Sequence, residues 1–167
     1  GGVYPSLSPD AAMSNDSIDF LVAGEGEERI LSLMHALKSG GGFDKVDGLR
    51  YRENGTILTN PQDGLGITDL DTVPWPDYSD YDMKELMNWG AKYTQNFQFR
   101  QFPVGMTATS RGCPYKCAYC AAGKDINPIN DWKVRGRSPE NVVGEIESLE
   151  EKYGMREIIF VDDSLLL

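Results

Sequence analysis

Three cysteines crowd into one short segment of the chain. Cys113, Cys117 and Cys120 are the only cysteines among its 167 residues, and they follow the spacing C-x3-C-x2-C. A disulfide framework needs an even number of cysteines spread along the chain. Three thiols on one loop can instead converge on a soft metal, which also requires them to be reduced. The pattern favours a reduced, cytoplasmic protein with a metal-binding loop, and three unrelated thiols are the alternative.

The ligand set that the sequence offers to such a metal is incomplete. A structural zinc takes four ligands, and the single histidine, His35, lies far earlier in the chain on a predicted helix, where we give it no role. A cubane iron–sulfur cluster has four irons, so three thiolates leave one iron open to another molecule. The residues favour such an open cluster, and a zinc site completed by another chain is the alternative.

The sequence around the cysteines predicts a strand, a helix and a second strand. Residues 104–109 form the first strand, and the cysteine loop follows it directly. Ser138 and Pro139 begin the helix as N-cap and first residue, and Gly154 ends it. Residues 157–161 form a buried second strand. This order is typical of a parallel sheet or barrel.

Charged residues lie next to these elements. Asp162 and Asp163 follow the second strand, and the C-terminal ends of barrel strands carry the active site. We therefore expect both carboxylates on the same rim as the cysteine loop, with a solvated strand end as the alternative. Arg135 and Arg137 precede the helix and either bind a carboxylate or phosphate or are simple surface charges.

The cysteine spacing, with the aromatic Tyr119 just before the last cysteine, resembles the signature of the radical SAM superfamily. Residues 104–167 are similar to the start of that family's partial TIM-like (β/α) barrel. The resemblance implies that the three cysteines ligate three irons of a [4Fe–4S] cluster. It also implies that S-adenosylmethionine (SAM) binds the fourth iron and is reductively cleaved to a 5′-deoxyadenosyl radical.

The same resemblance assigns roles to residues beside the cluster. It places Tyr119 against the adenine of SAM, and Asp162 or Asp163 at the SAM amino group. The family's usual glycine-rich form of the latter motif is absent here.

The N-terminal part predicts α/β structure of its own. Residues 19–23 form an apolar run suited to a buried parallel strand. A helix follows over residues 27–39 and ends at a glycine run, and a β-hairpin turns at Asn54 and Gly55. The apolar residues at helical spacing predict one buried face of that helix. They are Ile30, Leu31, Met34 and Leu37.

Residues 1–40 are similar to the last part of a Rossmann-like cobalamin-binding domain. A Gly-Gly pair and a Gly-Glu-Gly-Glu turn follow successive strands of such domains, and this chain has Gly1-Gly2 and Gly24 to Glu27 in that order. The resemblance places Gly1, Gly2 and Gly24 near cobalamin. The Asp-x-His-x-x-Gly segment that supplies a lower cobalt ligand in many such domains is not in this chain.

The predicted fold is α/β, with three parts in order. Residues 1–42 are the C-terminal part of a cobalamin-binding domain, residues 43–82 a β-hairpin and linker, and residues 83–167 the start of a radical SAM barrel. Val73, Trp75 and Tyr78 are expected to pin the linker to a domain surface. A full barrel needs about 200 residues, so we expect a fragment truncated at both ends, which alone neither folds robustly nor turns over.

The expected function is that of a cobalamin-dependent radical SAM enzyme acting by methylation or rearrangement at an unactivated carbon. The alternatives are a methylthiotransferase-like radical SAM enzyme without cobalamin and a non-enzymatic zinc- or cluster-binding module. We expect a small-molecule, lipid or tetrapyrrole-like substrate and a flavodoxin or ferredoxin as electron donor. The net charge of −10 argues against bulk nucleic-acid binding, and no apolar run is long enough for a membrane span.

Overall fold

The computed structural model of the chain divides into two compact units. The N-terminal unit comprises Gly1–Thr68 with Gly112–Val134, and the C-terminal unit comprises Asp69–Arg111 with Arg135–Leu167. The hairpin therefore belongs to the N-terminal unit, and most of the linker belongs to the C-terminal unit. The residues that the structure describes are 2–62, 66–83, 85, 103–115, 117, 119, 120 and 134–165.

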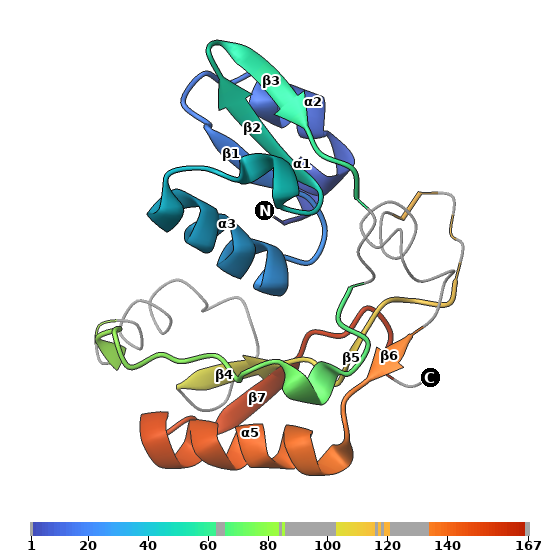
Figure 1. Cartoon of the computed structure of the whole chain (residues 1–167). Coiled ribbons are helices and arrows are strands. Elements are labelled where there is room, and N and C mark those ends of the chain that lie inside the picture. Colours follow the sequence, from blue (N-terminus) through green and yellow to red (C-terminus); the bar gives the residue numbers. More distant parts are fainter. Residues whose placement is uncertain are drawn as a thin grey trace. The chain divides into compact units, whose positions relative to one another are not determined.

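The described elements include both helices and strands (Figure 1). No helix in these ranges has the length and apolar character that crossing a membrane requires. In chain order the elements are α1 (Val3–Leu7), α2 (Pro9–Met13), β1 (Phe20–Val22), α3 (Glu27–Ser39), η1 (Phe43–Lys45), β2 (Leu49–Glu53), β3 (Thr56–Thr59), η2 (Leu70–Thr72), β4 (Val104–Thr107), β5 (Ser110–Arg111), β6 (Arg135–Gly136), α5 (Pro139–Tyr153) and β7 (Glu157–Phe160).

A three-stranded antiparallel sheet with the order β1-β2-β3 forms the centre of the N-terminal unit. Tyr51 of β2 stands opposite Phe20 on one side and Leu58 on the other. The predicted hairpin of β2 and β3 is confirmed. Asn54 and Gly55 at its turn both have positive φ, of 49° and 81°, as the tight Asn-Gly turn requires.

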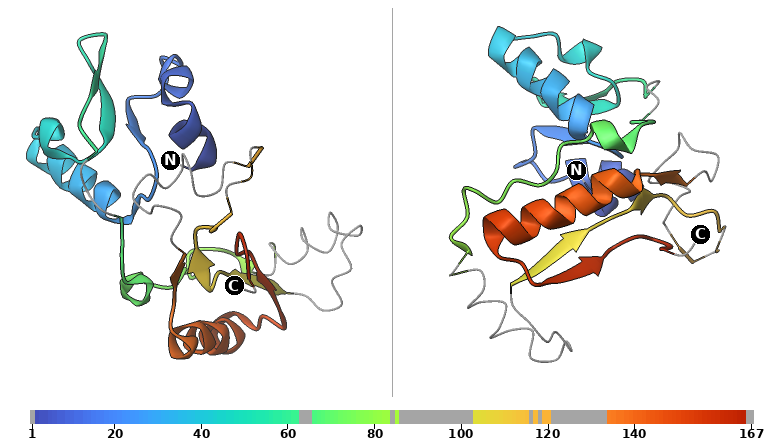
Figure 2. Two further views of the ribbon diagram at one scale, coloured as in Figure 1. Left: turned by 90° about the vertical axis from the view of Figure 1, so that its right-hand side faces the viewer. Right: turned by 90° about the horizontal axis from the view of Figure 1, so that it is seen from below.

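The prediction of a parallel strand over residues 19–23 is wrong for the pairing described, because β1 runs antiparallel to β2. Helices cover both faces of the sheet (Figures 1 and 2). On one face Val22 packs in a cluster with Leu33 of α3, and on the other Leu21 packs in a cluster with Met13 of α2. A strand covered on both faces is apolar throughout whatever its direction, so the apolar run could not specify the pairing.

Helix α3 is confirmed, including its left-handed cap at Gly40, but the predicted buried face is wrong. The four apolar residues predicted to be buried are between 43% and 63% exposed. The buried positions are instead Arg29, Leu33 and Ala36. Arg29 can face the core because its guanidinium pairs with Asp47, and Ile30, Met34 and Leu37 are exposed.

The C-terminal unit has a parallel strand pair, β4 and β7, with α5 packed on one face (Figure 2). The predicted strand–helix–strand order, the parallel pairing and the Ser138 cap are confirmed, since Ser138 Oγ accepts from the Asn141 amide at 3.1 Å. Gly105 pairs with Ile158 of β7, and a Cβ on Gly105 would come within 2.8 Å of that side chain and within 2.6 Å of Met155, which follows α5. A mixed α/β fold is thus confirmed.

The linker lies along α5 within the C-terminal unit. Trp75 packs on Gly144 and its Nε1 donates to Asn141 Oδ1 at 3.2 Å. The Tyr78 amide donates to the hydroxyl of Tyr153 at 3.0 Å, and the two rings meet edge-on at 5.4 Å. The prediction that the linker is pinned to a domain surface is therefore confirmed for Trp75 and Tyr78, and for Val73 it stays a prediction.

Candidate functional site

A buried ion pair lies at the C-terminal end of β4. Arg137 contacts the carboxylate of Glu145, which is only 2% exposed. The Thr107 hydroxyl donates to the same carboxylate oxygen at 2.6 Å. Arg137 Nη1 also donates to the carbonyl oxygen of Ala108 at 2.9 Å. Of the two alternatives for Arg137, the structure supports carboxylate binding, and the residue holds the end of the strand.

Asp162 lies two residues beyond β7 and contacts the chain that follows β4. The Thr109 amide lies 3.0 Å from each carboxylate oxygen. The hydroxyls of Thr109 and Ser110 donate to Oδ1 at 2.7 Å and 2.6 Å. Partial burial, the largest single influence, raises the pKa of Asp162. The hydrogen bonds from Ser110 and Thr109 together outweigh it, so the pKa lies below its ordinary value.

Backbone pairing fixes the same stretch from its other side. β5 and β6 pair antiparallel, with Ser110 opposite Gly136. The Arg137 amide donates to the Thr109 carbonyl at 2.8 Å. The chain between β4 and the first cysteine is therefore tied to residues 135–137 and to Asp162.

The cysteine segment begins directly after β5. Gly112 has φ of 95°, a conformation that favours glycine. Cys113 is half-buried, Cys117 and Cys120 are exposed, and none of the three is in a disulfide. The Cys120 amide donates to the Cys117 carbonyl at 3.1 Å, which makes a tight turn between them.

Ligation by the three cysteines stays a prediction. In the part of the chain that the structure describes, no three His, Cys, Asp or Glu side chains form a group able to hold a metal ion. The donor set itself fits the expected group, because iron–sulfur clusters are held by thiolates and these thiols are reduced and reachable from solvent.

Two further predicted ligand-binding residues are accessible. Tyr119, between Cys117 and Cys120, is 93% exposed, and Asp163 is exposed beside the engaged Asp162. Among the described residues, no contact of either side chain blocks the approach of a ligand.

In the N-terminal unit the structure joins two of the predicted cobalamin-binding glycines through one hydroxyl. Ser6 Oγ donates to the Gly2 carbonyl at 2.7 Å and accepts from the Gly24 amide at 2.8 Å. Gly2 and Gly24 have φ of 97° and 71°, and a Cβ on Gly2 would meet nothing within 4 Å. This leaves open space beside the Gly2 backbone, as close approach of a large ligand requires. Gly1 lies outside the described residues.

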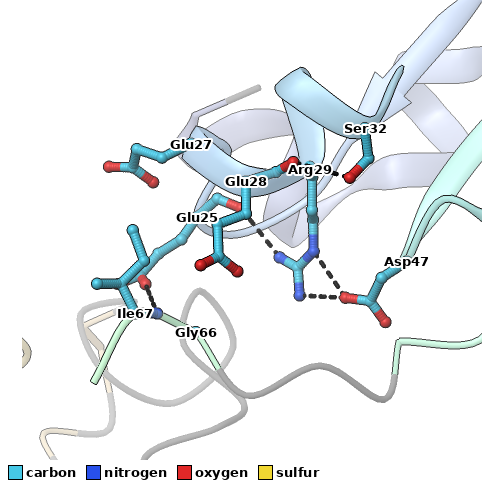
Figure 3. A pocket seen from close by; sticks show the side chains of 8 residues that line it. All are labelled: Glu25, Glu27, Glu28, Arg29, Ser32, Asp47, Gly66 and Ile67. Atoms are coloured by element: carbon cyan, nitrogen blue, oxygen red, sulfur yellow. Dashed lines mark hydrogen bonds and ion pairs between the residues drawn. The ribbon is translucent and has the colours of Figure 1, made fainter. Parts of the chain in front are cut away.

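The Gly-Glu-Gly-Glu turn is held by Arg29 (Figure 3). Its Nη1 donates to the carbonyls of Ala23 and Glu25, each at 3.0 Å, and its Nε donates to Asp47 at 2.8 Å. Glu25 in turn accepts from the Ile67 amide at 3.2 Å. These residues border a cavity of about 130 Å³. The turn after β1 is therefore a fixed feature of the unit.

Sequence reasoning missed Ser6, Arg29 and Glu145. Glu145 stands three residues after Val142 and four before Leu149, so a carboxylate occupies the apolar stripe of α5. Arg29 stands four residues before Leu33 in the same way. A charged residue at a core position was the available signal for both, because a buried charge requires a partner. Ser6 carried no such signal.

Comparison with known proteins finds a family that matches the C-terminal part of the chain and relatives that align with its whole length. Residues 107–167 match the profile of the radical SAM superfamily. The whole chain is 33% identical to an uncharacterized methyltransferase of Pyrococcus horikoshii, of which it covers 33%. It is 27% identical to the cytidylyl-2-hydroxyethylphosphonate methyltransferase of Streptomyces wedmorensis, with 99% of this chain and 34% of the relative aligned.

A cyclase is among the relatives as well. The chain is 30% identical to the anaerobic magnesium-protoporphyrin IX monomethyl ester cyclase of Synechocystis sp., over 98% of this chain and 30% of the relative. The chain therefore spans about a third of the length of the curated relatives that it matches.

The fold also matches solved structures. TsrM of Kitasatospora setae, a radical S-adenosylmethionine methyltransferase, aligns with 98% of this chain at a TM-score of 0.65 and 21% identity, over 29% of its own length. That structure contains tryptophan and a SAM analogue. A second structure of TsrM, with cobalamin and a [4Fe–4S] cluster bound, aligns at a TM-score of 0.61, covering 98% of this chain and 30% of its own.

Proposed function

Because the chain belongs to the radical SAM superfamily, we propose that Cys113, Cys117 and Cys120 hold a [4Fe–4S] cluster at which the full-length protein cleaves SAM. The observation that carries this proposal is the trio of thiols after β5, inside the matched stretch 107–167. Three thiolates leave one iron for the amino and carboxylate groups of SAM. When bound, the cluster supplies one electron that breaks the bond from sulfur to C5′, which yields methionine and a 5′-deoxyadenosyl radical.

The residues around the thiols supply binding and orientation. We assign the SAM amino group to Asp163, which is exposed, because the neighbouring Asp162 already accepts hydrogen bonds from Thr109 and Ser110. Tyr119 offers an exposed ring for the adenine. Arg137 and Glu145 do not contact a ligand in this proposal, and they hold the strand end from which the loop departs.

We further propose that the full-length protein uses cobalamin and carries out methylation or rearrangement at an unactivated carbon. Support comes from the similarity over nearly the whole chain to methyltransferases and a cyclase. The link from Gly2 through Ser6 to Gly24 also fits, because it fixes two glycine backbones, and open space lies beside that of Gly2. A lipid, tetrapyrrole-like or other small-molecule substrate is proposed, and a flavodoxin or ferredoxin as the one-electron donor.

The test is anaerobic reconstitution of the full-length protein with iron and sulfide. About four irons per chain and an EPR signal of the reduced protein that changes on adding SAM are expected. Cys117→Ala is expected to lose most of the iron and the SAM-dependent signal. Tyr115→Phe is the matched control, because Tyr115 lies in the same segment and is exposed but supplies no thiol.

The other outcomes separate the alternatives. One zinc per chain without iron contradicts the enzyme and supports a structural module. A SAM-responsive cluster without any corrinoid absorption in the visible range contradicts the cobalamin proposal and favours a methylthiotransferase-like enzyme.

A further inference from the structure

The carboxylate of Asp162 is placed where β7 meets the chain leaving β4. The Val161 amide donates to the Thr107 carbonyl at 2.9 Å, which continues the parallel pairing one residue beyond β7. Asp162 then turns its side chain toward Thr109 and Ser110. Three contacts end on Oδ1 and one on Oδ2, all from these two consecutive residues.

This arrangement acts on the chain just before the cysteines. Ser110 is three residues before Cys113, and only Arg111 and Gly112 lie between them. Thr109 is also tied through its carbonyl to the Arg137 amide. Its amide, hydroxyl and carbonyl all have defined partners, so the direction in which the chain leaves the strand pair depends on the Asp162 carboxylate.

We infer that Asp162 is a positioning residue that sets the start of the cysteine loop, and that it is not the carboxylate that binds the SAM amino group. A carboxylate is an acceptor with two oxygens, and here Oδ1 already accepts from two hydroxyls and an amide. An ammonium group at Oδ1 would have to displace these donors. This inference rests on the proposed function for its meaning, but the contact itself can be tested without a cluster.

The first experiment measures amide hydrogen exchange in the full-length protein without iron, in the peptide containing Thr109 and Ser110. Asp162→Asn is expected to speed exchange of the Thr109 amide about tenfold, because a neutral amide replaces the charged carboxylate as the acceptor. Asp163→Asn should leave that amide at its wild-type rate. An unchanged exchange rate in Asp162→Asn overturns the inference, whether or not the protein takes up a cluster. Failure to take up a cluster contradicts only the proposed function.

The second experiment uses the reconstituted protein. It tests whether the substitutions change the cluster itself or only the binding of SAM. Asp162→Asn and Thr109→Val are both expected to alter the EPR spectrum of the reduced cluster before SAM is added, and to lower its iron content. The double variant should be no worse than Asp162→Asn alone, because both substitutions remove one shared contact.

A direct role in SAM binding gives a different pattern. Asp162→Asn would then raise the Kd for SAM while the spectrum without SAM and the iron content stayed at wild-type values, and Thr109→Val would have no effect. That result overturns the inference. If Asp162→Asn fails to fold, Ser110→Ala replaces it, since it removes one donor and leaves the carboxylate in place. A wild-type SAM-free spectrum in Ser110→Ala and in Thr109→Val counts against positioning.

Discussion

The guanidinium of Arg137 and the carboxylate of Glu145 form an ion pair in which the two side chains are only 12% and 3% exposed. Glu145→Gln keeps the shape of the side chain but leaves the guanidinium buried without a counter-charge. We expect a loss of about 3 kcal/mol in the free energy of unfolding, because breaking a buried pair strands the remaining charge. Denaturant unfolding of the protein without iron measures this loss.

The matched control is Glu150→Gln, because Glu150 lies on the same helix as Glu145 and pairs with Arg156 beyond the helix end, with both side chains more than half exposed. A change of about 0.5 kcal/mol or less is expected there. Equal effects of the two substitutions would show that burial does not determine the contribution of the Arg137–Glu145 pair.

Ser6 joins Gly2 to Gly24, so Ser6→Ala removes both hydrogen bonds at once. We expect the full-length protein to bind corrinoid about tenfold more weakly, measured by its visible absorption during titration with hydroxocobalamin. Ser14→Ala is the control, because its hydroxyl also donates to a helix carbonyl, that of Ala11, but contacts neither glycine in the described structure. Equal affinity of Ser6→Ala and wild type would contradict the role of this contact in cobalamin binding.

The lowered pKa of Asp162 predicts a pH dependence. The folded state holds this carboxylate ionised below the ordinary pKa of aspartate, about 3.9. Its contribution to stability is therefore complete above that value and is lost as the pH falls through the lower folded-state pKa. Thermal unfolding of the protein without iron between about pH 5 and pH 2.5 should show a smaller loss of Tm in Asp162→Asn than in wild type. Parallel curves for the two proteins would refute this assignment.

Gly105 offers a test of the packing around β4. A Cβ there would lie 2.6 Å from Met155 Sδ and 2.8 Å from Ile158 Cδ1, inside the contact distance of real side chains. Gly105→Ala is expected to destabilise the protein by about 1 kcal/mol through overpacking, because the ends of the Met155 and Ile158 side chains must shift. Gly136→Ala should change stability by about 0.5 kcal/mol or less, since nothing lies within 4 Å of its added Cβ. Denaturant midpoints compare the two variants.

The sequence predicted the local elements where short-range chemistry dominates. The N-cap at Ser138, the glycine ends of α3 and α5 and the Asn54-Gly55 turn each depend on a few neighbouring residues, and all are confirmed. Strand direction and buried faces depend on distant partners. Residues 20–22 gave no sign of an antiparallel neighbour, and α3 buries Arg29, Leu33 and Ala36 in place of the expected apolar face.

The cysteine motif of the candidate site was predictable from the sequence. The contacts that hold the neighbouring chain in place were less predictable. Asp162 was found as a strand-end carboxylate, but its bonds to Thr109 and Ser110 depend on the register of β4 against β7, which the sequence does not state. Glu145 and Arg137 were harder, because two charges that neutralise each other in a core resemble surface residues when each is considered alone.

The contacts of Trp75 and Tyr78 with α5 bear on how this protein can be divided in the laboratory. Shortening it to begin at residue 83 would strip the indole from Gly144 and the Tyr78 amide from Tyr153, and would expose the helix surface that the two residues cover. A cut ahead of Asp69 keeps both aromatic side chains on their helix. A chimera that exchanges this region between relatives should therefore have its junction just before Asp69. Residues 69–78 then stay together with the helix that they cover.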